Sequence, residues 1–182
     1  NLDGINTRYD NPREIVAQIA SAGPEKATHL VQELYREPVR EKLIGKRVCE
    51  IKESGVPCAV STIPQNAEKW GPVAAEAGCD VFFVQSTVIT ARHKSTKYKV
   101  LDLARFCKSM KGPVVAGNCV TYGVAVELME TGIAGLLVGV GPGAACTTRG
   151  VLGLGVPQVT ATVDCAAARD FHFKKSGCYV PI

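Results

Sequence analysis

The sequence contains little of what marks membrane, zinc-binding or nucleic-acid-binding proteins. No apolar run is long enough to span a membrane, and no Cys-x-x-Cys pair or Cys/His cluster has the spacing of a zinc site. Aromatic residues make up 6% of the chain, and its 21 Lys and Arg are scattered among 17 acidic residues, for a net charge of +4. A nucleic-acid groove needs clustered positive charge and aromatic side chains. The composition therefore predicts no membrane, no nucleic-acid partner and no structural metal.

The first residues do not read as a signal peptide, and this bears on the eight cysteines. Cys58, Cys79 and Cys119 border apolar runs, where a reduced thiol acts as a small hydrophobic side chain. Disulfides persist mainly in oxidising compartments. We therefore expect reduced thiols and a cytoplasmic location.

The length and both ends of the chain bear on its domain organisation. Its 182 residues, 46% of them hydrophobic, suit one domain with a sizeable core. The chain begins without Met, Asn1–Ile5 reads like the exit from an earlier element, and Tyr179–Ile182 reads like a strand cut off at its start. We expect a piece of a longer protein.

Short apolar, β-branched runs alternate with segments of helical periodicity. The predicted strands are Cys58–Ile63, Val81–Gln85, Pro113–Ala116, Gly135–Val140 and Tyr179–Ile182. The predicted helices are Pro12–Ala22, Pro24–Tyr35, Lys42–Ser54, Gln65–Ala77, Val100–Met110, Tyr122–Thr131 and about Val159–Lys175. This α/β alternation satisfies both a doubly wound sheet and a TIM (β/α)₈ barrel. The even length of the repeated units favours the barrel, of whose eight strands five are visible here, the last of them cut short.

The ends of these elements indicate where the chemistry lies. Gly23, Gly55, Gly78 and Gly132 follow predicted helices, where a left-handed cap is expected. The loops that follow the predicted strands are polar or glycine-rich, whereas the loops that precede them are short. The sequence therefore predicts a functional face at the carboxyl ends of the strands.

The loop Gly139–Arg149 carries the strongest signal of a reactive residue. It follows a buried apolar run and presents Cys146 among glycines, with Thr147, Thr148 and Arg149 directly after it. Glycines expose backbone N–H groups to an anion. Hydroxyls and a cation beside a thiol lower its pKa. Cys146 is thus a candidate nucleophile, although free cysteines are often structural.

The same loop superficially matches the dinucleotide fingerprint Gly-x-Gly-x-x-Ala at Gly139, Gly141 and Ala144. Pro142 interrupts the pattern, and the next acidic residue, Asp164, lies inside a predicted helix. A Rossmann site would place that acid on the cofactor ribose. The pattern favours an anion-binding loop that presents a nucleophile.

Polar residues end two further predicted strands. Asn118 would face the same edge as Cys146, or alternatively cap the following helix. Gln85, Ser86 and Thr87 end another strand, where they would either contact a ligand or form an ordinary turn. We expect the three histidines, His29, His93 and His172, to be solvated or to lie on helix surfaces.

These motifs together resemble the inosine-5′-monophosphate (IMP) dehydrogenase and GMP reductase family. The resemblance is carried by Gly139–Arg149, Gly155–Gln158 and Gly117–Thr121. Within the family the chain looks closest to the compact GuaB3 branch of cyanobacteria and actinobacteria, through Asn1–Tyr9, Val84–His93 and Asp164–Arg169. The resemblance implies one partial catalytic (β/α)₈ barrel over residues 1–182, with only about strands three to seven of the eight present and without regulatory CBS domains in this chain.

The resemblance also implies roles for single residues. Cys146 would be the nucleophile that attacks C2 of the purine, with the Thr148 hydroxyl beside it. Gly143, Ala144 and Cys146 would contact the substrate. The cofactor NAD would contact Gln85, Ser86, Thr87, Asn118, Gly139 and Gly141. Backbone carbonyls of Gly141, Gly143 and Cys146 would hold a monovalent cation, typically K⁺.

The implied activity is NAD-dependent oxidation of IMP to XMP by a cytoplasmic homotetramer. Two departures qualify it: Gln85 stands where the dehydrogenases have an Asp that grips the cofactor ribose, and Ala144 stands where they have Ser. Because the phosphate loop and the mobile flap would lie outside residues 1–182, we expect this chain alone to be inactive. GMP reductase, which deaminates GMP with NADPH, and a non-catalytic purine-nucleotide binder remain alternatives.

Overall fold

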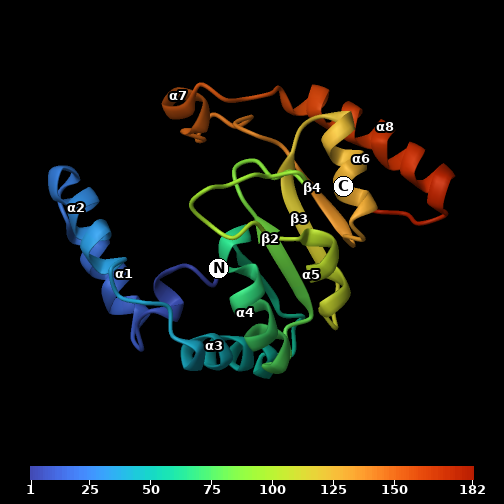
Figure 1. Cartoon of the computed structure of the whole chain (residues 1–182). Coiled ribbons are helices and arrows are strands. Elements are labelled where there is room, and N and C mark those ends of the chain that lie inside the picture. Colours follow the sequence, from blue (N-terminus) through green and yellow to red (C-terminus); the bar gives the residue numbers. More distant parts are fainter.

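The protein is centred on a parallel sheet. A computed structural model describes all residues from Asn1 to Ile182. The four strands are β1 (Ala59–Thr62), β2 (Val81–Gln85), β3 (Val114–Cys119) and β4 (Gly135–Val138), and they lie side by side in chain order (Figure 1). A (β/α)₈ barrel repeats this arrangement. Because all strands run parallel, the loops after them meet at one edge of the sheet.

A helix joins each strand to the next. These helices are α4 (Pro64–Glu76), α5 (Leu103–Ser109) and α6 (Tyr122–Glu130), and α8 (Gln158–Ser176) follows β4 and packs beside α6 (Figure 1). β1 and β2 bury every second residue, as a pleated strand with one covered face does. Phe82 from β2 contacts Phe106 from α5, with ring centroids 5.6 Å apart. The apolar periodicity of strands and helices thus builds one core.

The N-terminal part is helical. It comprises the 3₁₀ turn η1 (Ile5–Thr7), α1 (Pro12–Ser21), α2 (Pro24–Leu34) and α3 (Glu41–Glu53). α3 packs against α4, whereas α1 and α2 form a hairpin that extends away from the sheet (Figure 1). No residue of either hairpin helix is buried.

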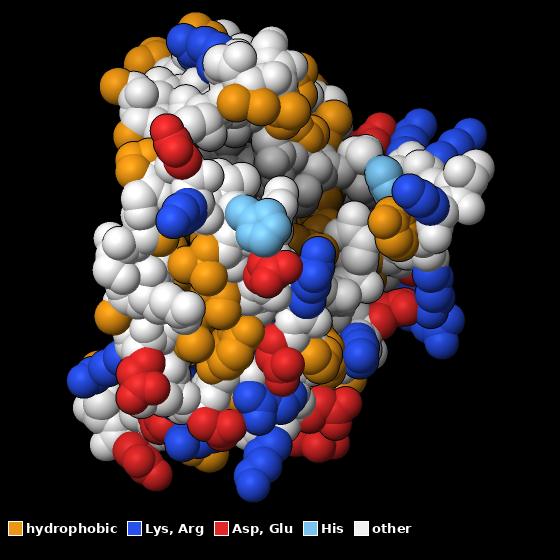
Figure 2. Space-filling model, turned by 90° about the vertical axis from the view of Figure 1, so that its left-hand side faces the viewer, with side chains coloured by type: hydrophobic (Ala, Val, Ile, Leu, Met, Phe, Trp, Pro, Cys, Tyr) orange, Lys and Arg blue, Asp and Glu red, His pale blue; other side chains and the backbone are white.

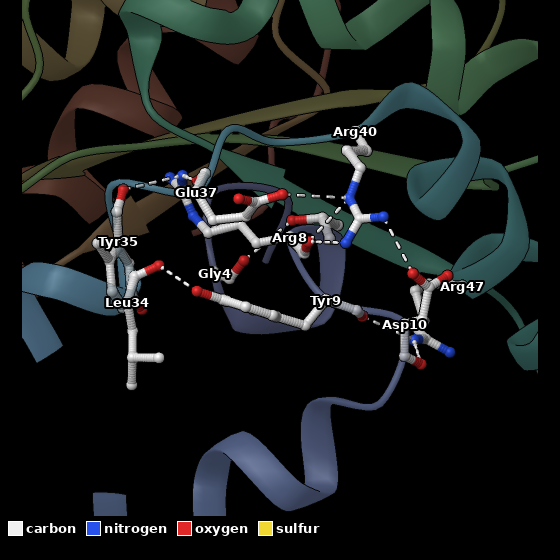
Figure 3. A network of polar contacts seen from close by, with 10 residues as sticks. Gly4, Arg8, Tyr9, Asp10, Leu34, Tyr35, Glu37, Arg40 and Arg47 are labelled. Atoms are coloured by element: carbon white, nitrogen blue, oxygen red, sulfur yellow. Dashed lines mark hydrogen bonds and ion pairs between the residues drawn. The ribbon is translucent and has the colours of Figure 1, made fainter. Parts of the chain in front are cut away.

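Three arginines fix the base of this hairpin (Figure 3). Arg8 donates to backbone carbonyls on both sides of the hairpin, at Asp3, Tyr35 and Glu37. Arg40 donates to the Arg8 carbonyl and to Asp10, and Arg47 binds the carbonyls of Asn6, Tyr9 and Asp10. A guanidinium group carries five donors in a fixed fork, so one side chain can hold several chain segments.

The predicted elements agree with the structure except at specific points. The first four predicted strands and all seven predicted helices are present, with ends shifted by up to a few residues. Tyr179–Ile182 is not a strand, since only the Pro181 carbonyl bonds β4, accepting from Leu136 N–H at 2.9 Å, and proline has no N–H to return. The short helix α7 (Thr148–Leu152) was not predicted.

Two single-residue predictions are wrong. Gly23 is the N-cap of α2 with a φ of −62°, not a left-handed cap, because the connection between α1 and α2 passes through an extended Ala22. His172 is only 7% exposed, because it lies on the face of α8 that packs toward α6. By contrast, Gly55, Gly78 and Gly132 have the predicted positive φ.

The surface carries charges of both signs, and the cysteines form no disulfide. Positive and negative side chains intermingle over the lower part of the face in Figure 2. All eight cysteines are free. None of the helices has the length and apolar character that crossing a membrane requires. No group of three or more His, Cys, Asp or Glu side chains is arranged to hold a metal ion.

Candidate active site

A cavity of about 400 Å³ lies at the carboxyl edge of the sheet. Its lining comes from the N-terminus, the ends of β2 and β3, and the loops after β2 and β4 up to the start of α7: Asn1, Gln85, Ser86, Thr87, Asn118, Gly139, Val140, Gly141, Pro142, Cys146 and Thr148. Eight of these were predicted from the sequence as site residues. The structure therefore brings the separated motifs to one place, at the end of the strands where barrel enzymes carry their active sites.

The ends of β2 and β3 hold each other through backbone hydrogen bonds. Ser86 N–H donates to the Gly117 carbonyl at 2.8 Å, and Asn118 N–H donates to the Ser86 carbonyl at 3.0 Å. The side chains of Gln85, Ser86 and Thr87 form no hydrogen bond within the protein and face the cavity. They are therefore free to bind a polar ligand rather than committed to a turn.

Asn118 does not cap the following helix. Its Nδ2 donates to the carbonyl of Gly139 at 2.8 Å, while the N-cap of α6 is Thr121. The side chain thus connects the end of β3 to the loop after β4, and its carboxamide oxygen has no partner in the protein. That oxygen can accept a hydrogen bond from a ligand in the cavity.

Two glycines shape the loop that follows β4. Gly139 and Gly141 have φ values of +126° and +60°, which disfavour other residues. A Cβ at Gly139 would lie 2.5 Å from Gln158 Oε1, and one at Gly141 would lie 2.7 Å from the Leu154 carbonyl oxygen. Gln158 donates to the Val138 carbonyl and so supports the loop from α8. No local sequence pattern indicates this supporting role of Gln158, because the role depends on how α8 packs against the loop.

Cys146 lies exposed in a turn just before α7, where its N–H donates to the Gly143 carbonyl at 3.1 Å. Hydrogen bonds from the hydroxyl and the N–H of Thr148 lower the pKa of the Cys146 thiol, and the nearby charge of Arg149 contributes. Burial has the opposite effect elsewhere: it raises the pKa of Cys79 and Cys107 to about 11 and that of Cys165 to about 12. The surroundings of Cys146 thus favour its thiolate form, the reactive form of a cysteine.

The remaining predicted site residues, Gly143 and Ala144, do not line this cavity and are exposed on the same turn. Gly141 and Gly143 have no side chain that could cover their backbone carbonyls. Backbone carbonyls can coordinate monovalent cations. The Gly143 carbonyl already accepts one hydrogen bond and keeps one lone pair. Both carbonyls lie on the loop after β4, where the family resemblance implies a monovalent-cation site.

A second, smaller cavity of about 80 Å³ adjoins the first and shares Ser86 with it. It is lined by Pro64, Gln65, Ser86, Val88, Ile89, Thr90, His93, Leu101 and Leu103. Neither cavity has an Asp or Glu in its lining. Amide and hydroxyl groups without partners in the protein, beside a partly apolar cavity, fit a nicotinamide dinucleotide. No carboxylate is present to accept a hydrogen bond from its ribose.

Known proteins match the chain over its whole length. Uncharacterised oxidoreductases of Mycobacterium tuberculosis and Mycobacterium bovis are each 38% identical over 100% of this chain and 50% of their own length. The IMP dehydrogenase of Pasteurella multocida is 38% identical over 62% of the chain and 22% of its own length. The chain thus spans about half the length of the first two relatives.

Solved structures also match the fold of this chain. An IMP dehydrogenase/GMP reductase-like protein from Corynebacterium glutamicum superimposes with a TM-score of 0.89 at 34% identity, over 99% of this chain and 48% of its own. The GMP reductase of Trypanosoma brucei, solved with guanosine 5′-triphosphate, gives 0.51 at 28% identity over 62% and 26% of the two chains. The fold is that of a partial (β/α)₈ barrel. Because the IMP dehydrogenase / GMP reductase domain profile matches residues 24–176, the chain belongs to this family.

Proposed function

We propose that this chain carries the nucleophile and part of the cofactor site of an NAD-dependent oxidoreductase that converts IMP to XMP. One observation supports this above the others: the ionisable thiol of Cys146 shares a cavity with the uncommitted polar groups of Gln85, Ser86, Thr87 and Asn118. A nucleophile and a dinucleotide site must be adjacent for hydride to pass between their ligands.

In the proposed reaction the Cys146 thiolate forms a bond to C2 of the purine. The C2 hydride then leaves, and the resulting thioimidate between Cys146 and the nucleotide is hydrolysed by water to release XMP and the free thiol. NAD⁺, when bound, supplies the hydride acceptor. Thr148 stabilises the thiolate before attack, and Asn118 orients the ligand amide through its free oxygen.

The partners of the site are part of the same proposal. Gly143, Ala144 and Cys146 contact the nucleotide, and the carbonyls of Gly141, Gly143 and Cys146 hold K⁺. A homotetramer, a cytoplasmic location and membership of the GuaB3 branch follow from the resemblance. Since the chain spans about half of its relatives' length, the rest of the substrate site is proposed to lie outside these residues.

The test is NADH formation from IMP and NAD⁺ with K⁺ present, measured on these 182 residues and on the longest form of the protein that its gene encodes. We expect turnover by the longer form, none by this chain alone, and none by Cys146→Ala. Cys178→Ala, which removes another exposed thiol, is the matched control and should retain activity. Turnover by Cys146→Ala would refute the assignment of the nucleophile.

GMP reductase is the second candidate, because a protein of that name shares the fold. It predicts NADPH-dependent release of ammonia from GMP and no reduction of NAD⁺ with IMP. A non-catalytic purine-nucleotide binder is the third, motivated by Gln85 and Ala144. It predicts IMP binding without either redox reaction, and a burst of NADH would exclude it.

A further inference from the structure

The loop between β2 and α5 contains a basic segment, which we define as Arg92–Lys99. It carries Arg92, His93, Lys94, Lys97 and Lys99 and no acidic residue. Every one of these five side chains is exposed. A chain whose net charge is only +4 thus concentrates positive charge in one loop.

Two of these cations are neutralised within the protein and two are not. Arg92 pairs with Glu127 at 3.1 Å, and Lys99 pairs with Glu68. The ammonium groups of Lys94 and Lys97 form no ion pair or hydrogen bond. Ser95 Oγ accepts from the N–H groups of Lys97 and Tyr98, at 3.1 and 3.0 Å, which gives the segment a defined turn. The loop therefore presents two uncompensated ammonium groups.

The basic segment adjoins the cofactor side of the site. His93 lines the smaller cavity, and Ser86 lines both this cavity and the larger one, which Cys146 also lines. A long ligand that begins beside Cys146 and passes Ser86 into the smaller cavity therefore reaches His93, which directly precedes Lys94. It meets no carboxylate in the lining of either cavity.

This charge distribution suits a phosphorylated ligand. Dinucleotide sites that select an unphosphorylated ribose use an acidic residue to accept from its hydroxyl, and sites for a 2′-phosphate use a basic one. Lysine binds phosphate as a point charge. Here Gln85 replaces the acid, and Lys94 and Lys97 offer the charge.

We propose that Lys94 and Lys97 bind the phosphate groups of the nicotinamide dinucleotide, so that this chain holds its cofactor by charge instead of by a ribose carboxylate. The inference rests on the proposed function, because it assumes that a dinucleotide occupies the cavity. The phosphate has two possible sources: the pyrophosphate, which NAD⁺ and NADP⁺ share, and the 2′-phosphate, which only NADP⁺ carries.

The test is equilibrium binding to the longest form of the protein that its gene encodes. The probes are NAD⁺, NADP⁺, ADP and adenosine 2′,5′-bisphosphate. We expect Lys94→Gln/Lys97→Gln to weaken binding roughly ten-fold at low salt, with a smaller loss at high salt because exposed ion contacts are screened. Lys46→Gln/Lys111→Gln removes two exposed, unpaired lysines elsewhere and should leave binding unchanged.

The probes separate the two sources. Weakened binding of NAD⁺, NADP⁺ and ADP, the three probes with a pyrophosphate, assigns the lysines to the pyrophosphate. Weakened binding of NADP⁺ and the bisphosphate, with NAD⁺ and ADP unchanged, assigns them to the 2′-phosphate. Unchanged affinity and salt dependence in the double variant would overturn the inference, as would failure of the wild type to bind any probe. Weakened binding in a protein that does not oxidise IMP would refute the proposed function and leave this inference standing.

Discussion

The side chain of Asn118 holds the peptide of Gly139 by a hydrogen bond of 2.8 Å from Nδ2 to the carbonyl oxygen. Asn118 lies near the end of β3, and Gly139 directly follows β4. The loop that presents Cys146 therefore starts from a peptide that is fixed from the neighbouring strand. Positioning of a nucleophile depends on such support, because small displacements of reacting groups reduce rates strongly.

Asn118→Asp removes the donor in this contact and places a carboxylate against the Gly139 carbonyl. We expect a loss of about 1 to 3 kcal/mol in the free energy of unfolding, since the hydrogen bond is replaced by repulsion between two acceptors. Urea denaturation measures it. Asn11→Asp, at the N-cap of α1 where no side-chain bond exists, is the control and should be neutral or stabilising. Equal stability of both variants would contradict the supporting role of Asn118.

Thr148→Val should raise the pKa of Cys146. The threonine hydroxyl bonds the thiolate and so favours the charged form, and the isosteric valine cannot do this. We expect the pH profile of Cys146 alkylation, followed by peptide mass spectrometry, to move to higher pH. Thr28→Val on exposed α2 should leave the profile in place. A profile unmoved by Thr148→Val would mean that another group lowers the pKa.

Gly117→Ala should destabilise the sheet severely. A Cβ at this position would lie 2.5 Å from Leu137 Cβ and 2.6 Å from the Leu137 carbonyl oxygen, so β3 and β4 would have to separate. We expect a cost of about 3 kcal/mol or more in urea denaturation. Gly123→Ala, in α6 with open space around it, should be neutral or stabilising by about 0.5 to 1 kcal/mol. Similar stability of the two variants would contradict the close strand approach.

Asp80 should contribute to the acid sensitivity of the fold. Its carboxylate accepts from Lys52 Nζ at 2.8 and 2.9 Å and from Cys58 N–H at 2.6 Å, and these bonds lower its pKa. Its stabilising contribution is therefore complete above the ordinary Asp pKa and is lost as the pH falls through the lower folded value. We expect Asp80→Asn to lower the free energy of unfolding at neutral pH and to reduce its dependence on acid.

Denaturation at neutral and at acid pH measures this effect. Asp164→Asn, which removes an exposed and unpaired carboxylate, is the control. An acid dependence that is the same in Asp80→Asn and in the wild type would show that other carboxylates dominate.

Much of the fold and site follows from local sequence patterns. The strands at Val81–Gln85 and Gly135–Val138 are short apolar runs that follow the glycine at the end of a helix, and the left-handed glycines at 55, 78 and 132 follow from helix endings. The meeting of Gln85, Asn118 and Cys146 also follows, because the carboxyl ends of parallel strands share one edge.

Other features depend on contacts between segments distant in the chain. His172 looks like a surface residue in its own helix, yet α6 covers it. The bonds of Arg8, Arg40 and Arg47 to backbone carbonyls have no sequence signal, since any carbonyl serves as acceptor.

The sequence by itself determined the βα order, the candidate nucleophile Cys146 and the family resemblance, because apolar period, glycine placement and a rare motif are local properties. Only the tertiary structure decided that Asn118 holds Gly139, that Gln158 lies against the same peptide, and that Lys94 and Lys97 remain without an acidic partner in a loop whose His93 lines a cavity. These three relationships depend on which side chains lie close together in space, and the packing of segments distant in the chain determines this.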